Sequence, residues 1–386
     1  MVWYGEWPNS VNSVDLSVDE AEYSGLARVK TYVDTENNFI ETFDSSTGFY
    51  VRSGVLANGI DTGVDPFMRN YPQLIDIGVM GTCAHALNGL CRQAGVQCYQ
   101  KGNSVVRQNM SVGDFVSIAE QCASKVFQFA LGGRGDVDQH PQFEKLLAIS
   151  RECGIVPNFT TSGIKMSSTI ANVCKRYVGA IAVSWYRSQH TLDAISTLLR
   201  SGIKTNIHYV LGNNTIDEAI KRLEDRSFPR GINAVIFLLH KPVGFGEEAN
   251  VLQQSDPKVG KFFRIIDTLD QPYMIGFDSC SVPALVTMAK SIDHVSTDCC
   301  EGARYSCYID AQMNMTPCSF AQDTCWFVDL RTTTIADAWN SEPFQRFRHT
   351  LRNSCPDCPD QPLCRGGCPI VNRVTLCSRK ERCYDS

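Results

Sequence analysis

The sequence predicts an α/β protein in which six β-α units form a parallel sheet curled into a full or partial barrel, followed by a smaller cysteine-rich domain. Two observations carry this prediction. Between residues 74 and 240, short apolar runs of strand length alternate with segments of helical periodicity. Of the 18 cysteines, twelve fall between residues 280 and 383, which marks a change of composition near residue 275. A chain of 386 residues is long enough for one large domain and a smaller one.

Six apolar runs are the predicted strands, because they are rich in Val, Ile and Phe as buried parallel strands are. They are LIDIGVM (74–80), KVFQFAL (125–131), IVPNFTT (155–161), VGAIAVS (178–184), IKTNIHYV (203–210) and INAVIFLLH (232–240). Helical spacing is found between them, for example over 140–153, 190–202 and 215–226. Strands in this order take right-handed crossovers, and the reactive face of such a barrel lies at the C-terminal ends of its strands.

The order of these segments predicts three parts of the chain. Residues 1–72 are an N-terminal extension, in which 38–56 has the pattern of two strands around an SSTG turn, as in a β-hairpin. The barrel is expected over residues 73–272. The cysteine-rich domain is expected over 273–386.

Composition and charge exclude several classes of partner. The net charge of −5 and the isoelectric point near 5.8 give no electrostatic reason to bind nucleic acid or an anionic membrane. No window contains the roughly 18 apolar residues of a membrane span, and the N-terminus lacks a basic segment followed by an apolar run. We therefore expect a cytoplasmic protein.

The cysteines are expected to bind metal, because the cytosol keeps thiols reduced and clustered cysteines there more often are metal ligands than disulfides. The loop after the first predicted strand carries Cys83, Cys91 and Cys98, separated by seven and six residues. Three thiolates on a [4Fe–4S] cluster leave one iron open to a substrate or cofactor. The alternative is a structural zinc site in which His85 is the fourth ligand.

Polar or glycine-rich features follow the first four predicted strands. They are Cys83, GGRGD (132–136), TTSG (160–163) and Ser184. Because the ends of parallel strands meet at one face, these features are expected to converge on one mouth of the barrel.

This order of features resembles the radical S-adenosylmethionine (SAM) enzymes, including the aromatic Tyr99 after the last loop cysteine and KPVGFG (241–246) after the sixth strand. The resemblance implies a partial (β/α)6 TIM-like barrel. It also implies that a cluster on Cys83, Cys91 and Cys98 binds and reductively cleaves SAM to a 5′-deoxyadenosyl radical. Gly132 and Gly133 would then border the amino group of SAM, and Ser184 would contact the ribose.

The sequence departs from that family in two places. The loop cysteines usually have three and two residues between them, whereas this chain has a CX7CX6C motif. The usual GGE reads GGRGD, so the acceptor for the SAM ammonium group would be Asp136 or a backbone carbonyl.

The C-terminal cysteine run has spacings of two, five and three residues, and it consists of Cys355, Cys358, Cys364 and Cys368. A zinc ribbon is possible on spacing alone, because CxxC pairs occur in both zinc and iron–sulfur sites. Residues 332–369, however, closely resemble the SPASM extension of radical SAM enzymes, and residues 300–320 are similar to its first half, with Met313 where a glycine is usual.

The SPASM resemblance implies two auxiliary [4Fe–4S] clusters, and hence three clusters in the whole chain. The proximal auxiliary cluster would be held by Cys280, Cys300, Cys318 and Cys368. The distal one would be held by Cys355, Cys358, Cys364 and Cys383. Cys307 and Cys377 are possible substitutes in these sets, and Cys299 lies beside Cys300.

The function predicted from these resemblances is that of a radical SAM oxidoreductase. It would abstract hydrogen from a peptide or protein substrate, while an auxiliary cluster accepts an electron or binds the substrate, and a flavodoxin or ferredoxin would supply the electron for SAM cleavage. A radical SAM dehydrogenase or epimerase for a small molecule, and a zinc-stabilised interaction protein, remain as alternatives. No catalytic acid or base is assigned, since a histidine on a barrel strand is more often a hydrogen-bonded core residue, and His208 and His240 are both on predicted strands.

Overall fold

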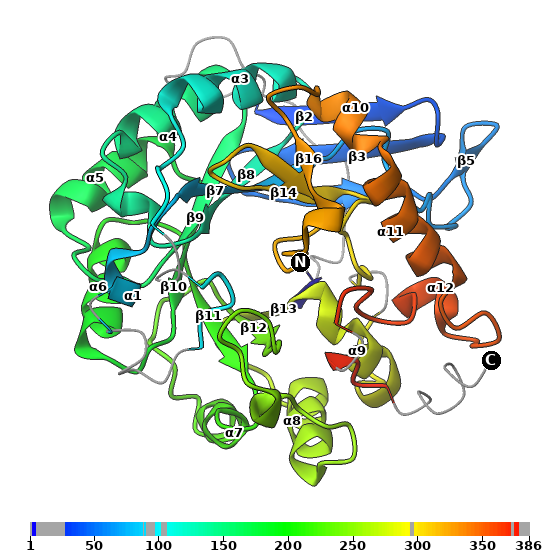
Figure 1. Ribbon diagram of the computed structural model, residues 1–386. Coiled ribbons are helices and arrows are strands. Elements are labelled where there is room, and N and C mark those ends of the chain that lie inside the picture. The colour runs from blue at the N-terminus through cyan, green and yellow to red at the C-terminus, as the bar shows by residue number, and fades with distance from the viewer. Residues whose placement is uncertain are drawn as a thin grey trace.

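The structure is a computed structural model that describes the backbone of residues 2–4 and residues 28–87, 89, 97–101, 106–293, 297–371 and 374–377. Its main feature is one curved sheet with helices on its outer side (Figure 1). The strand order in this sheet is β1-β13-β12-β11-β10-β9-β8-β7-β14-β15-β16. This is the mixed α/β architecture expected from the sequence.

All six predicted strands are present and pair in parallel with their neighbours along the chain. They are β7 (Leu74–Met80), β8 (Gln128–Gly133), β9 (Val156–Thr161), β10 (Ile181–Ser184), β11 (Thr205–Leu211) and β12 (Ala234–Leu239). A seventh parallel strand, β13 (Met274–Phe277), follows β12 in the sheet. These residues lie within 273–386, the range predicted for the C-terminal domain, so the barrel sheet continues past the predicted six units.

The helices between these strands have one apolar face, which covers the outside of the barrel. They are α3 (Val112–Cys122), α4 (Phe143–Glu152), α5 (Ser168–Tyr177), α6 (Gln189–Arg200), α7 (Ile216–Glu224) and α8 (Pro257–Thr268). Serines begin several of them: the Ser167 side chain accepts from the backbone N–H of Ile170, and that of Ser188 from Thr191. Such caps satisfy N–H groups that the first helical turn leaves without a partner.

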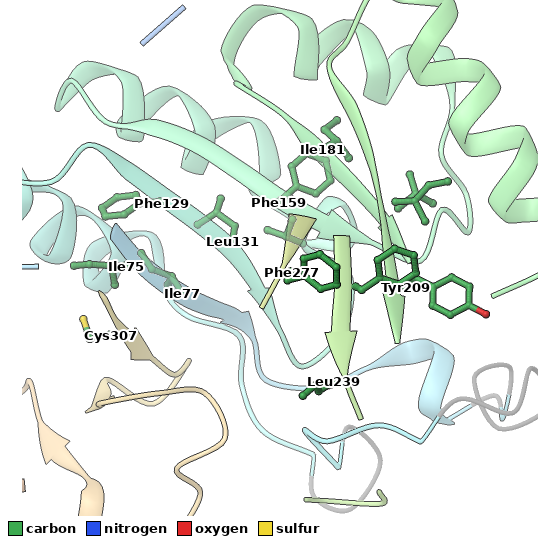
Figure 2. Close-up of a cluster of buried hydrophobic side chains, with 14 of the residues drawn as sticks. Ile75, Ile77, Phe129, Leu131, Phe159, Ile181, Tyr209, Leu239, Phe277 and Cys307 are labelled. Atoms are coloured by element: carbon green, nitrogen blue, oxygen red, sulfur yellow. The ribbon is translucent and has the colours of Figure 1, made fainter. Parts of the chain in front are cut away.

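The core lies between the outer face of the sheet and the helices. Figure 2 shows Ile75 and Ile77 of β7 beside Phe129 and Leu131 of β8. At the other end of the sheet, the rings of Phe237 and Phe262 pack edge to face with centroids 5.0 Å apart. Burial of these side chains is the main term that holds the helices on the sheet.

The inner face of the sheet differs from the outer face. The residues that alternate with the core side chains are small or polar, and they include Asp76, Gly78, Gly132, Thr160 and His208. The apolar residues of each run therefore cover only the outer face of the sheet. The other face lines the inside of the barrel with polar groups.

The C-terminal part of the chain extends the same sheet. Strand β14 (Ser306–Ile309) pairs in parallel with β7, and β15 (Asn314–Thr316) and β16 (Val328–Asp329) follow in antiparallel order. Helices α9 (Val282–Met288), α10 (Ile335–Trp339), α11 (Glu342–Asn353) and α12 (Gln361–Cys364) complete this part. The pairing of β14 with β7 places the C-terminal part directly beside the first barrel strand.

The N-terminal part forms a separate small sheet of β2 (Val29–Asp34), β3 (Phe39–Asp44) and β4 (Tyr50–Arg52), followed by the short pair β5 (Leu56–Ala57) and β6 (Ile60–Asp61). The turn between β3 and β4 contains the SSTG sequence. Strand β1 (Val2–Tyr4) pairs antiparallel with β13. In the part of the chain that is described, no helix is both long and apolar enough to cross a membrane.

Candidate functional site

The first predicted cluster loop begins where β7 ends. Cys83 is buried and is followed by the short helix α1 (Ala84–Leu87), whose Ala86 N–H lies 3.4 Å from the Cys83 sulfur. The Cys98 thiol is close enough to Cys83 to act on it electrostatically, and burial raises the pKa of Cys83. Two of the three predicted ligands therefore lie together. Cys91 falls outside the described residues.

The GGRGD segment lies against this loop. A Cβ atom on Gly135 would approach the Cα of Cys83 to 3.1 Å, and one on Gly133 would approach the Cα of Gly78 on β7 to 2.7 Å. Gly133 and Gly135 also have φ near +90°, which favours glycine. A Cβ on Gly132, by contrast, would meet no atom within 4 Å, so this position faces open space at the mouth. A ligand can approach the backbone there, as the amino group of SAM would have to.

Asp136 is engaged by other residues of the chain. Its carboxylate is 2.8 Å from His85 Nε2 and accepts hydrogen bonds from the backbone N–H of Ser162, at 2.8 Å, and from the Ser162 hydroxyl. It thereby links the first cluster loop to the TTSG segment after β9. Its predicted contact with the SAM ammonium group stays a prediction, and these contacts already use both carboxylate oxygens.

Ser184 ends β10 and is half-buried beside His208 of β11. His208 Nδ1 lies 3.3 Å from the Thr160 hydroxyl, and burial lowers the pKa of His208 to about 4. His208 is therefore a neutral group inside the barrel at neutral pH. His240 pairs with the Glu247 carbonyl oxygen at 3.0 Å, as a structural histidine would.

The KPVGFG loop after β12 holds the last part of the first cluster loop. The N–H of Phe245 donates to the Cys98 carbonyl at 3.0 Å, and the N–H of Glu247 donates to the Gln97 side chain at 2.9 Å. Gly244 has φ +70°, and a Cβ there would overlap the backbone of Tyr99. The sixth barrel strand thus fixes Cys98 from the side opposite β7.

Four cysteines from distant parts of the chain meet beside the barrel. The Cys280 and Cys368 thiols hydrogen-bond to each other, and both are close enough to Cys300 and Cys318 for mutual electrostatic effects. Four buried or half-buried thiols fit the donor set of an iron–sulfur cluster. Within the described residues, no three His, Cys, Asp and Glu side chains are arranged to hold a single metal ion, and the cluster on these thiols stays a prediction.

A buried lysine lies against this set of thiols. The Lys241 ammonium donates to Asp278 Oδ2 at 2.7 Å and to the Leu239 carbonyl at 3.2 Å, and it lies 4.4 Å from the centre of the Phe320 ring. Burial lowers the pKa of Lys241, but Asp278 and the thiols of Cys280 and Cys368 outweigh this effect and raise it. Lys241 is therefore a permanent positive charge beside predicted thiolates.

Residues 299–359 match the family model of an iron–sulfur cluster-binding domain, SPASM. This match includes Cys300, Cys318, Cys355 and Cys358, and it ends before Cys364 and Cys368. The chain carries a SPASM domain. No curated protein sequence matches the chain.

Solved structures of two SAM-bound enzymes have a similar fold. SuiB of Streptococcus suis bound to S-adenosylmethionine is 12% identical, with a TM-score of 0.64 over 91% of this chain and 99% of SuiB. The enzyme anSMEcpe with bound AdoMet is 14% identical, with a TM-score of 0.54 over 82% of this chain and 92% of anSMEcpe. The fold is that of radical SAM enzymes with a SPASM domain, as the sequence predicted.

The SPASM domain brings the distal cysteines together in part. Cys364 lies near Cys358 and Cys377, whose charges would raise its pKa in addition to the effect of burial. A Cβ on Gly366 would be 3.3 Å from the Cys355 sulfur, so this sulfur lies next to the turn that follows Cys364. Cys377, one of the two possible substitutes, thus lies near Cys364, where Cys383 was predicted. Cys383 falls outside the described residues.

Sequence patterns give no role to three residues that lie at this site. They are Lys241, Phe320 beside it, and Tyr308, whose hydroxyl lies near Gly78 and Gly133. Each side chain reaches the site through tertiary contacts that have no local pattern. The position of Lys241 directly after the apolar run INAVIFLLH, at the end of a predicted barrel strand, is a signal that the sequence does contain.

Proposed function

We propose that the protein is a radical SAM oxidoreductase that modifies a peptide or protein substrate at an unactivated C–H bond. The main support is that three separate loops, those after β7, β8 and β12, meet around Cys83 and Cys98. Lys241 of the loop after β12 also lies beside two thiols of the proximal auxiliary set, Cys280 and Cys368. Cys83, Cys91 and Cys98 would hold the SAM-binding cluster. The open space over Gly132 would receive the amino-acid end of SAM.

The bound cluster and SAM would supply a 5′-deoxyadenosyl radical once an external donor, such as a flavodoxin or ferredoxin, provides one electron. That radical would take one hydrogen atom from the substrate and become 5′-deoxyadenosine. The substrate would then lose one more electron, to an acceptor at the proximal auxiliary site, and one proton, which together make a two-electron oxidation. Cys280, Cys300, Cys318 and Cys368, whose thiols lie near one another, would hold this acceptor.

A cavity of about 570 Å³ beside the proximal cysteines supports a peptide as substrate. It lies between the loop after β12 and the SPASM domain, and its lining includes Pro242, Val243, Phe320, Trp326 and Pro369. The charged and amide side chains of Glu248, Gln322 and Asp323 also line it, so its character is mixed. A cavity of this size with both apolar and polar groups can receive side chains of a peptide. SuiB has been solved with its precursor peptide SuiA, and anSMEcpe with the Cp18Cys peptide, which gives the proposal further support.

Anaerobic purification followed by metal analysis tests the cofactor assignment. The proposal requires about twelve irons per chain and 5′-deoxyadenosine formation from SAM with dithionite. A Cys83→Ala/Cys91→Ala/Cys98→Ala variant should keep about eight irons and lose SAM cleavage. Stoichiometric zinc without iron would instead identify a zinc-stabilised interaction protein.

The substrate class is tested by the neighbouring open reading frames. A short peptide gene next to this one should give a peptide that loses two hydrogens, a decrease of about 2 Da by mass spectrometry, when it is incubated with the reduced enzyme and SAM. A small-molecule biosynthetic operon, together with 5′-deoxyadenosine formation on a small substrate, would favour the dehydrogenase or epimerase alternative.

A further inference from the structure

A tyrosine of the SPASM domain projects into the barrel mouth. Tyr308 is on β14 and is the register partner of Asp76 on β7, so both side chains point to the inside of the barrel. The neighbouring residues Cys307 and Ile309 pair with Ile75 and Ile77 and belong to the core on the outer face. The phenol therefore lies on the side of the sheet that faces the ligand.

The Tyr308 hydroxyl lies at the glycines of the mouth. A Cβ on Gly78 would overlap the hydroxyl, and a Cβ on Gly133 would be 2.9 Å from it. Both glycines therefore leave room for this hydroxyl. Gly133 is also one of the two residues expected to border the amino group of SAM.

Tyr308 is more than nine-tenths buried, with 8% of its surface exposed. The hydroxyl at the end of this ring can both donate and accept a hydrogen bond. Its position at Gly78 and Gly133 places it where a polar group of a ligand in the mouth would lie.

The chain lacks the glutamate of the usual GGE motif, which would accept a hydrogen bond from the SAM ammonium group. The third residue of GGRGD is Arg134, which cannot accept a hydrogen bond. Asp136, the predicted substitute, is engaged with His85 and Ser162. A tyrosine hydroxyl can accept a hydrogen bond from an ammonium group.

We propose that the Tyr308 hydroxyl of the SPASM domain contacts the ammonium group of the methionine moiety of SAM and replaces the missing acidic side chain. The inference rests on the proposed function, because it requires SAM in the mouth. It makes the auxiliary domain part of the SAM site. Tyr308 is then a binding residue for SAM as well as a strand residue of β14.

The test compares SAM binding by wild type and Tyr308→Phe, each reconstituted with iron under anaerobic conditions and measured by equilibrium dialysis without reductant. Loss of a charge-assisted hydrogen bond should weaken SAM binding about tenfold. Methylthioadenosine lacks the amino-acid part of SAM, and its affinity should be the same for both proteins. The control Tyr209→Phe removes a buried hydroxyl that bonds the Thr215 carbonyl at 2.8 Å, on the helix side of the sheet, and should leave SAM affinity unchanged.

A second variant tests the same contact from the β7 side. The methyl group of Gly78→Ala would displace the Tyr308 hydroxyl and should weaken SAM binding by a similar factor. In the Tyr308→Phe background the hydroxyl is gone and the nearest ring carbon is 3.1 Å away, so Gly78→Ala should add little. If Tyr308→Phe lost iron, Gly78→Ala on the intact side chain would provide the measurement.

Wild-type SAM affinity in both iron-loaded variants, or an equal loss for SAM and methylthioadenosine, would overturn the inference. Failure of the wild-type protein to bind iron or to cleave SAM would overturn the proposed function instead. The two failures are therefore distinguishable.

Discussion

Lys241 illustrates how a single side chain connects the barrel to the SPASM domain. It follows β12 on the barrel, yet its ammonium lies beside thiols from three segments of the C-terminal part. Its side chain is 2% exposed and that of Asp278 is 18% exposed, so water contributes little to the stability of either charge. The attraction between the two charges must therefore compensate for the hydration energy that both groups lose on burial.

We predict that Lys241→Met lowers the free energy of unfolding by about 3–5 kcal/mol, because Asp278 is left as a buried charge without its counter-ion. Urea unfolding of the cluster-free protein in the presence of a reducing agent measures this. The control is Lys258→Met, which removes an exposed pair with Asp217 and should leave stability almost unchanged. Equal effects of the two substitutions would show that the buried pair is not important for stability.

Asp76 gives a pH-dependent prediction. Burial, reinforced by Glu301, raises the pKa of this carboxyl to about 7, compared with 3.8 ordinarily. The folded protein therefore binds a proton more tightly than the unfolded chain does, and this contribution to stability is lost as the pH rises from about 4 to about 7. Asp76→Asn should remove that part of the pH dependence, so that the wild type loses more stability than the variant over this range.

Urea unfolding at several pH values between about 4 and 8 checks the prediction for Asp76. Asp138 has a raised pKa of about 6 and produces a dependence of the same sign in both proteins. The difference between wild type and variant therefore isolates Asp76. Parallel curves would mean that the carboxyl titrates normally in the folded state.

Residue identities in the site were predictable where a family pattern fixes them. Cys280, Cys300, Cys318 and Cys368 were assigned through the SPASM resemblance, and the structure brings them together. Tyr308 could not be found in this way, because its position depends on the pairing of β14 with β7, between residues more than 200 positions apart. No local spacing records such a contact.

At the scale of elements, the position of a strand in the sequence was easier to predict than the strand with which it pairs. The predicted strand LIDIGVM has the same bounds as β7. Its side chains Ile75, Ile77 and Val79 are buried in the core, which gives the run its apolar pattern. Strand β14 has only four residues and includes Ser306 and Cys307, so it lacks an apolar pattern of its own. It is a strand because β7 supplies a hydrogen-bonding edge.

The loop after β12 is an element whose role can be tested through Gly244. We predict that Gly244→Ala displaces Tyr99 and the adjacent Cys98, and lowers the iron content from about twelve to about eight per chain with loss of SAM cleavage. Gly202→Ala is the matched control, because Gly202 has nearly the same φ, +73° against +70°, but no atom within 4 Å of the added Cβ. Both variants bear the cost of a positive φ, and only Gly244→Ala adds the overlap.

Metal analysis and 5′-deoxyadenosine formation distinguish the two glycine variants. Equal iron content in both would mean that the loop after β12 does not hold the first cluster loop in place.

At the scale of the whole molecule, the N-terminal extension and the SPASM domain meet at Asp65. Its carboxylate pairs with Arg304 at 2.6 Å and with Arg365 at 3.1 Å, both from the SPASM domain, and Arg52 of the N-terminal sheet lies 3.7 Å away. Arg52 also bonds Asp298 at 3.1 Å. The N-terminal extension is thus a support for the SPASM domain.

We predict that Asp65→Ala destabilises the cluster-free protein by about 3–5 kcal/mol, because the guanidinium of Arg304 is fully buried and would lose its carboxylate partner. Since this contact lies between the N-terminal sheet and the SPASM domain, the variant should also become sensitive to proteolysis near the loops that join them. Urea unfolding and limited proteolysis measure the two effects. Glu144→Gln, which removes an exposed pair with Arg176, should change neither. If Asp65→Ala behaved like Glu144→Gln, the N-terminal sheet and the SPASM domain would be held together by apolar packing, such as the edge-to-face contact of Phe39 with Tyr305, and not by this network of charges.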